Sequence, residues 1–240
     1  MSTLSRWIPA DWKVKIKQKL GVPGMFWSLE NLKNNGFHPR KIIDIGAYQG
    51  EWTQEALAIF PAASFLMVEA QSIKEPFLSK LAGANPDQLQ YSIALLGADN
   101  DAEVVFHEME TASSVLTEHY ATSATPTTKK TVQLDALTKA RGFEGANFLK
   151  LDTQGYELEI LKGGENTLRR AEAVLMEVSL LDIHRGVPLM REVVDFMGDR
   201  GFQVYDICSF TRRPLDKALW QTDMIFVKKE SALLSDKRYA

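Results

Sequence analysis

A glycine-containing acidic segment, Asp44-Ile-Gly-Ala-Tyr-Gln-Gly50, lies at the end of the apolar run 41–45. Gly46 permits a sharp turn and a close approach of a ligand to the main chain, and Gly50 does the same where a helix begins. Glu69 ends the next apolar run, where its carboxylate can accept hydrogen bonds from both hydroxyls of a ribose. These residue types predict a site for a nucleoside-containing cofactor.

The kind of cofactor follows from the charges around this segment. The dinucleotide fingerprint G-x-G-x-x-G requires glycines at 46, 48 and 51, but the chain has Gly46, Tyr48 and Glu51. Glu51, in the first turn of the expected helix, would repel a pyrophosphate. S-adenosylmethionine (SAM) carries a sulfonium and an ammonium and no phosphate, which suits a segment bounded by Asp44 and Glu69. We therefore predict SAM; a tight strand-to-helix turn without a ligand is the alternative.

A second segment with chemical potential is FLKLDTQGYE at 148–157. Asp152 ends an apolar run, Gly155 frees the backbone beside it, and Glu157 enters the first turn of the next expected helix. In a parallel sheet the carboxyl ends of the strands meet at one edge, so Asp152 is expected to face the same ligand crevice. A helix cap is the simpler alternative for Asp152.

A third set of polar residues follows the run 173–178. Glu177 lies near its end, and His184 lies in the segment beyond it. We consider Asp152, Glu177 and His184 candidate catalytic bases, and His184 is attractive because an unperturbed histidine has a pKa of about 6.5. A solvated strand end for Glu177 and a surface imidazole for His184 are the alternatives.

A metal ion is a competing hypothesis for the same place. Asp152 and Glu177 at adjacent strand ends could hold Mg²⁺, which acidifies a bound hydroxyl without a dedicated base. One carboxylate pair is fewer ligands than Mg²⁺ sites normally offer, so the sequence leaves this choice open.

Short apolar runs that alternate with helical segments must position these residues. We expect strands at 41–45, 64–68, 89–96, 147–151, 173–178, 202–207 and 223–228. One crossover helix begins after Gly50 and ends at Pro61, and another lies near 72–82. Alternation of this kind is typical of βαβ units and predicts a doubly wound α/β fold with a mostly parallel sheet.

The domain organisation predicted from these patterns is one main domain at 37–230, with a helical extension at 1–36 and a tail at 231–240. Tryptophans and lysines in the extension suit either a solvated helix or an arm that binds a partner or a membrane surface. The segment 99–134 interrupts the βαβ pattern, and we expect an inserted hairpin and loop there. Its residues His107, Ser113, Ser114 and His119 suit either a lid over the substrate or a solvated loop.

Composition excludes several classes of function. The 240 residues carry 28 Lys and Arg against 31 Asp and Glu, a formal net charge of -3, so nucleic acid is not an expected partner. Cys208 is the single cysteine and permits no intrachain disulfide, no signal-peptide pattern opens the chain, and no apolar run approaches the ~20 residues of a membrane span. A cytoplasmic location is predicted, and no pattern indicates an oligomeric state.

Several motifs together resemble the FkbM family of SAM-dependent methyltransferases over residues 33–228. In chain order they are IIDIGAYQGEWT, VEAQ, SIALLG, ASSVL, LDAL, FLKLDTQGYELEILKGG, LMEVS and WQTDMIFVK. The resemblance implies a Rossmann-like class I methyltransferase fold whose seven-stranded sheet has its last strand, 223–228, inserted antiparallel. It also implies O-methylation of a hydroxyl on a sugar or secondary metabolite.

The resemblance also implies roles for individual residues. Asp44, Gly46 and Gly50, with Tyr48 between them, would hold the methionine part of SAM and Glu69 its ribose. Ile93 and Ala94 would flank the adenine, and Asp152 would lie near the transferred methyl group. The chain departs from the family pattern at Gln154, where members commonly have an acidic residue, and at His184, where many have a tyrosine.

Two other functions remain open at this point. One is a nicotinamide-dependent oxidoreductase, which the missing glycines oppose. The other is a SAM-binding scaffold protein without turnover, which Gln154 makes conceivable. For any enzyme of this kind we expect acceptor specificity to lie in 99–134 and 180–190, where no short motif encodes a substrate.

Overall fold

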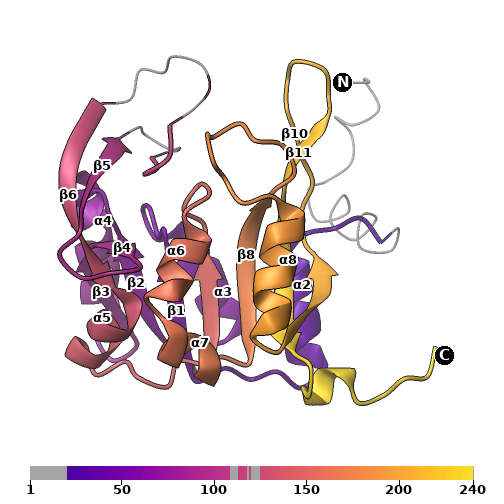
Figure 1. The fold of residues 1–240 in the computed structure, drawn as a ribbon. Coiled ribbons are helices and arrows are strands. Elements are labelled where there is room, and N and C mark those ends of the chain that lie inside the picture. The colour runs from indigo at the N-terminus through magenta and orange to yellow at the C-terminus, as the bar shows by residue number, and fades with distance from the viewer. Residues whose placement is uncertain (1–20, 109–112, 118, 120–124, 240) are drawn as a thin grey trace, which may run out of the picture.

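The structure, a computed structural model, describes residues 21–108, 113–117, 119 and 125–239 (Figure 1). Within this part of the chain a central sheet is covered by helices on both faces. The helix α2 (Met25–Asn34) belongs to the predicted N-terminal extension. The first predicted helix, which includes Trp12 and the lysines near it, lies outside the described residues.

The central sheet has the order β10-β11-β8-β7-β1-β2-β3, and β9 also pairs with β11. The strands are β1 (Lys41–Ile45), β2 (Ser64–Glu69), β3 (Leu89–Ile93), β7 (Phe148–Leu151), β8 (Ala173–Ser179), β9 (Phe202–Ile207), β10 (Thr211–Arg212) and β11 (Leu219–Lys228). β1, β2, β3, β7 and β8 run parallel, and β11 lies antiparallel between β8 and β9. The predicted fold class and the antiparallel last strand are confirmed, and the two-residue strand β10 makes the sheet eight-stranded.

The apolar run 89–96, which we expected to form one strand, forms two. It divides at Ala94 into β3 and β4 (Leu95–Gly97), and β4 pairs with β6 (Thr125–Gln133) in a separate sheet of order β4-β6-β5, in which β5 is Glu103–Glu108. Both halves of the run carry buried side chains, so hydrophobicity does not mark the break. The prediction of a single strand was wrong for this reason.

Helices pack on both faces because the central strands alternate between them. Ile42 and Ile43 are both fully buried but belong to different core clusters, one on each face of the sheet. Their neighbours come from α3 (Glu51–Ile59), α4 (Glu75–Ala84), α5 (Leu134–Ala140), α6 (Glu157–Lys162), α7 (Glu165–Arg170) and α8 (Met190–Asp199). Burial on both faces explains why these strands are mostly apolar.

One edge of the sheet collects the loops of interest. Because β1, β2, β7 and β8 are parallel, the segments that follow Ile45, Glu69, Leu151 and Ser179 meet at their carboxyl ends. β5, which pairs antiparallel with β6, contributes Phe106 to the same region. Among the described residues, no helix combines the length and the apolar character that a membrane crossing requires.

Candidate active site

The loop after β1 is held in an unusual backbone conformation against the end of β7. Gly46 has φ +75°, and a side chain at this position would overlap the carbonyl oxygen of Asp152. Its backbone N–H donates to the carbonyl oxygen of Val68 at 2.9 Å. Tyr48 adopts φ +51°, which is rare for a residue other than glycine. Glycine at 46 is therefore required by the close approach of two main chains.

Glu69 joins this loop to the segment after β2. Its Oε2 accepts the backbone N–H of Tyr48 at 2.8 Å, and its Oε1 accepts that of Gln71 at 2.9 Å. A carboxylate has about four lone-pair sites, so both oxygens retain capacity for hydroxyl donors. The Glu69 side chain is thus fixed in place while it can still bind a ligand.

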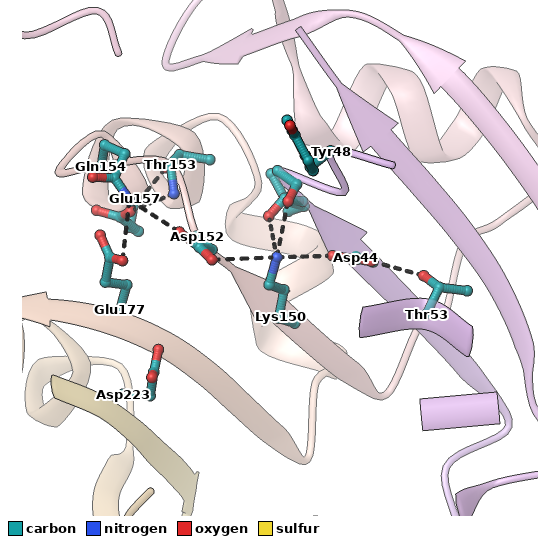
Figure 2. Close-up of polar contacts among 12 residues, drawn as sticks. Asp44, Tyr48, Thr53, Lys150, Asp152, Thr153, Gln154, Glu157, Glu177 and Asp223 are labelled. Carbon is teal, nitrogen blue, oxygen red and sulfur yellow. Dashed lines mark hydrogen bonds and ion pairs between the residues drawn. The ribbon is translucent and has the colours of Figure 1, made fainter. Parts of the chain in front are cut away.

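Asp44 lies between Lys150 and Thr53, on the side of Lys150 opposite Asp152 (Figure 2). Its carboxylate is fully buried, with Oδ1 at 3.0 Å from Lys150 Nζ and Oδ2 accepting the Thr53 hydroxyl at 2.7 Å. Oδ2 is thus hydrogen-bonded, whereas Oδ1 is held by the ion pair alone and accepts no hydrogen bond. In this structure Asp44 supports the loop, and the contact with the cofactor that we expected from the sequence stays a prediction.

Lys150, to which the sequence analysis assigned no role, connects the two sides of the site. Its side chain is 5% exposed, and Nζ lies 2.9 Å from the carbonyl oxygen of Gly46 and 3.8 Å from Asp152 Oδ2. Burial alone lowers the pKa of a lysine, but the carboxylates of Asp44 and Asp152 raise the Lys150 pKa above its ordinary value. The sequence offered one signal of this role, because Lys150 is the single charged residue within the apolar run FLKL.

The loop after β7 carries a group of polar side chains (Figure 2). Gln154 Nε2 donates to Asp152 Oδ1 at 3.3 Å and to Glu177 Oε2 at 3.1 Å. Glu157 Oε1 accepts the backbone N–H of Thr153 at 2.8 Å and that of Gly155 at 3.3 Å, which holds the turn in which Gln154 has φ +57°. Asp152 and Glu177 are therefore brought together, as predicted, with an amide between them.

The acidity of Glu177 is suppressed by its surroundings. Burial raises its pKa well above the ordinary value, and the negative charges of Asp152, Glu157 and Asp223 raise it further. Asp223 lies directly opposite Glu177 in the β11–β8 register, and burial raises its pKa too. Glu177 is consequently harder to ionise than an ordinary glutamate.

The residues present do not fit the Mg²⁺ ion considered above. The NH₂ group of Gln154 lies between the two carboxylates and donates to both, in the place where a cation would have to sit. In the described part of the chain, no group of three or more His, Cys, Asp or Glu side chains is arranged to hold a metal ion. The magnesium hypothesis is therefore unsupported.

His184 is buried in the segment that follows β8, so the alternative of a surface imidazole is wrong. This segment is bound to the 99–134 insert, because Arg185 N–H donates to the Thr117 carbonyl at 2.7 Å and His119 N–H to that of Ile183 at 3.2 Å. The insert in turn contacts the acidic cluster, since the Ser114 hydroxyl donates to the carbonyl oxygen of Gln154 at 3.0 Å. The two segments in which we expected specificity are thus linked.

A cavity of about 240 Å³ lies between these groups. Predicted residues on its wall are Gly46, Tyr48, Glu69, Ala94 and Asp152. The insert adds Ser113, which the sequence named as a candidate lid residue, and Phe106 and Val115, which it did not identify. The predicted residues Asp44, Gly50, Ile93, Glu177 and His184 are not on the wall.

The doubly wound sheet with an antiparallel β11, the glycine loop after β1 and the carboxylate after β2 define a Rossmann-like class I methyltransferase fold. Over residues 44–204 the chain matches the methyltransferase FkbM domain, and it belongs to this family. The family resemblance stated from the sequence is confirmed, and the oxidoreductase alternative has no support. No curated protein sequence matches the chain.

Solved structures with a similar architecture are distant in sequence. An uncharacterized protein from Listeria monocytogenes is 10% identical, with 86% of this chain and 67% of that chain covered and a TM-score of 0.50. Precorrin-6y C5,15-methyltransferase from Geobacter metallireducens is 13% identical, with 85% of each chain covered and a TM-score of 0.48. A putative tRNA methyltransferase from Streptococcus pneumoniae, in complex with S-adenosyl-L-methionine, is 14% identical, with 86% and 75% covered and a TM-score of 0.49.

Proposed function

We propose that the protein is a SAM-dependent O-methyltransferase that acts on a hydroxyl of a small molecule, a sugar or a secondary metabolite. Membership of a methyltransferase family supports methyl transfer as the reaction. The observation that carries the rest is one cavity whose wall includes Glu69 on one side and Asp152 on the other. This shared cavity supports a nucleoside-binding role for Glu69 and an acid–base role for Asp152.

In this proposal the cofactor is held mainly by the β1 and β2 loops. Glu69 accepts hydrogen bonds from the ribose hydroxyls, and the Gly46–Tyr48 main chain contacts the methionine part. Ala94 and the apolar side chains of Val68, Leu96 and Ile160, which line the same cavity, surround the adenine. Asp44 acts indirectly, because its ion pair with Lys150 holds the Gly46 loop.

The chemistry requires a proton acceptor and a fixed geometry. SAM, when bound, would supply an electrophilic methyl group for transfer from its sulfonium to the acceptor oxygen. Asp152 would accept the hydroxyl proton. Glu177, whose pKa is raised by burial and by the neighbouring carboxylates, would lie beside it across the Gln154 amide. Positioning of the reactants contributes up to ~7 to 11 kcal/mol, and a placed base commonly adds 10²- to 10⁴-fold.

A SAM-binding protein without turnover is the second candidate, and one observation favours it. Gln154 donates to both carboxylates and so occupies lone pairs that a general base would use. We propose a cytoplasmic location for either function, because the free and buried Cys208 suits a reducing compartment.

The cofactor is tested by thermal unfolding with S-adenosylhomocysteine, SAM, NAD, NADP and ATP. A ligand at 100 times its dissociation constant stabilises by ~2.7 kcal/mol, which raises the midpoint by several degrees. We expect this shift with the two sulfur nucleosides alone, and its loss in Glu69→Gln. Glu55→Gln, an exposed carboxylate on α3, is the matched control. A shift with NAD instead would contradict the proposal.

The reaction is tested by transfer of a labelled methyl group from SAM to a panel of sugars and hydroxylated metabolites. We expect Asp152→Asn to lose transfer by about 10² or more while it keeps the S-adenosylhomocysteine shift. Binding of the cofactor without transfer to any acceptor would favour the second candidate. Full transfer by Asp152→Asn would show that Asp152 is not the base, and His184→Ala would then be the next variant.

A further inference from the structure

A hairpin beside the active-site edge exposes large apolar side chains. Thr211 and Arg212 of β10 pair with the start of β11, and residues 213–218 connect them. In Figure 1 this hairpin projects from the top of the molecule, beyond the body of the sheet. Phe210 is 54% exposed and Leu215 is 84% exposed. Apolar side chains of this size cost free energy in water unless a partner covers them.

The turn that presents Leu215 is well ordered by its own hydrogen bonds. Arg213 makes a bidentate ion pair with Asp216, at 2.7 Å from Nε to Oδ1 and 2.6 Å from Nη2 to Oδ2. Its backbone N–H donates to the Ala218 carbonyl at 3.0 Å, and Arg212 Nη1 donates to the Lys217 carbonyl at 2.9 Å. Leu215 is therefore held outward by an ordered turn.

The charge around these apolar side chains is positive. Arg212, Arg213 and Lys217 against Asp216 leave this short segment with three positive charges and one negative, in a chain whose formal net charge is -3. An apolar apex surrounded by basic residues is complementary to a surface with negative headgroups over a hydrocarbon layer.

We propose that this hairpin docks the protein on an anionic lipid surface, with Phe210 and Leu215 entering the interface. Two isolated apolar side chains on a convex turn suit lipid better than a protein partner, which would need a matching pocket for each. The backbone bonds within the turn, such as that from Arg213 N–H to Ala218, also limit the polar groups carried into the interface.

Docking in this way would turn the cavity edge of the sheet toward the lipid. The base of the hairpin is bound to the segment after β8, because Leu180 N–H donates to the Trp220 carbonyl at 2.8 Å. The acceptor would then meet the enzyme close to a membrane surface. The docking itself does not depend on the proposed reaction, since it is measured without cofactor or acceptor.

The experiment is co-sedimentation of the full chain with vesicles of phosphatidylcholine mixed with phosphatidylglycerol, and with vesicles of phosphatidylcholine alone. We expect binding to the mixed vesicles that weakens with salt. The double variant Phe210→Ser, Leu215→Asp should bind the mixed vesicles at least about tenfold more weakly than the wild type, because each substitution removes an apolar side chain from the interface. Lys217→Gln should weaken binding about fivefold, as one basic residue near such a surface contributes about that much.

Ile73→Asp is the matched control, because Ile73 is 73% exposed but lies in the short 3-10 turn Ser72–Lys74, outside the hairpin. Its binding should equal that of the wild type. An unchanged thermal midpoint in each variant shows that it folds. The shift of this midpoint with S-adenosylhomocysteine is measured without vesicles, so that a failure of the cofactor proposal is distinguished from a failure of the docking proposal. No binding to either vesicle, or equal binding by the double variant, would overturn the docking proposal.

Discussion

The two sides of the cavity hold their side chains by different means. On the side proposed for the cofactor, formed by the ends of β1, β2 and β3, backbone groups fix the site: Glu69 accepts the N–H groups of Tyr48 and Gln71, and Gly46 donates to Val68. On the acidic side, formed by the ends of β7, β8 and β11, side chains fix one another, and Gln154 bridges Asp152 and Glu177.

The difference affects how each side responds to substitution. A site fixed by backbone geometry tolerates no added bulk at its glycines but has few coupled charges. A site of mutually bonded side chains can change its protonation state when one member is replaced, because its pKa values depend on the others. Lys150 contacts both sides, through the Gly46 carbonyl and through Asp152. The following predictions test this division.

The largest effect is expected for Gly46→Ala. The added carbon would overlap the Asp152 carbonyl at a backbone φ of +75°, so β1 or β7 must move. We expect a loss of more than about 5 kcal/mol in the free energy of unfolding, or no folded protein. Urea unfolding measures it. Gly145→Ala is the control, because its φ is +77° with nothing nearby, and it should lose only about 1 to 2 kcal/mol. Equal losses would mean that the close approach is not critical.

Lys150→Met removes the cation that both sides share. Asp44 is then left buried without a counter-charge, and breaking a buried pair costs about 3 to 5 kcal/mol. The double variant Asp44→Asn, Lys150→Met should recover part of this loss, as measured by a double-mutant cycle in urea. Lys162→Met, at an exposed ion pair with Glu159, should change stability by less than about 1 kcal/mol. A double variant as unstable as the sum of its parts would contradict the coupling.

Glu177→Gln tests the acidic side through pH. The Glu177 pKa is raised in the folded protein, so the proton is held more tightly there than in the unfolded chain. The stability from this group is complete below its ordinary pKa of 4.5 and is lost as pH rises toward the folded pKa. Relative to Glu177→Gln, the wild type should lose about 1.4 kcal/mol for each pH unit in that interval. Glu144→Gln, at an exposed carboxylate, is the control, and its stability should follow that of the wild type from about pH 5 to 8. If Glu177→Gln also followed the wild type over this range, the raised pKa of Glu177 would be contradicted.

The smallest effect is expected for Gln154→Glu. It replaces the bridging amide by a third carboxylate beside Asp152 and Glu177, which provides the oxygen ligands that a divalent cation requires. We expect this variant to gain about 1.4 kcal/mol with Mn²⁺ at ten times its dissociation constant, seen as a rise in thermal midpoint. The wild type and Gln54→Glu should show no such rise. A rise in the wild type that depends on Asp152 would restore the metal hypothesis.

The sequence was sufficient for most of the fold. All seven predicted apolar runs contain a strand of the central sheet, and in β1, β2, β7, β8 and β11 most side chains are buried, which requires mostly apolar residues. The error at 89–96 has the same origin, since Leu95 and Leu96 are buried in a second sheet and look no different in sequence. The two-residue strand β10 is too short to leave any pattern.

Some residues of the candidate site were found from the sequence, and others were not. Gly46, Tyr48, Glu69 and Asp152 were found from local motifs, and all lie on the cavity wall. Lys150 was not found, because its partners Asp44 and Asp152 matter only once β1 and β7 are neighbours.

The sequence by itself determined the family, the alternation of strands and helices, and several residues of the cavity wall, because each depends on short-range patterns of burial and backbone freedom. The tertiary structure alone decided that Asp44 pairs with Lys150 and that Asp223 lies opposite Glu177. It also decided that the insert reaches Gln154 through Ser114. These contacts join residues far apart in the chain, and their electrostatic consequences depend on distances that only the packed sheet sets.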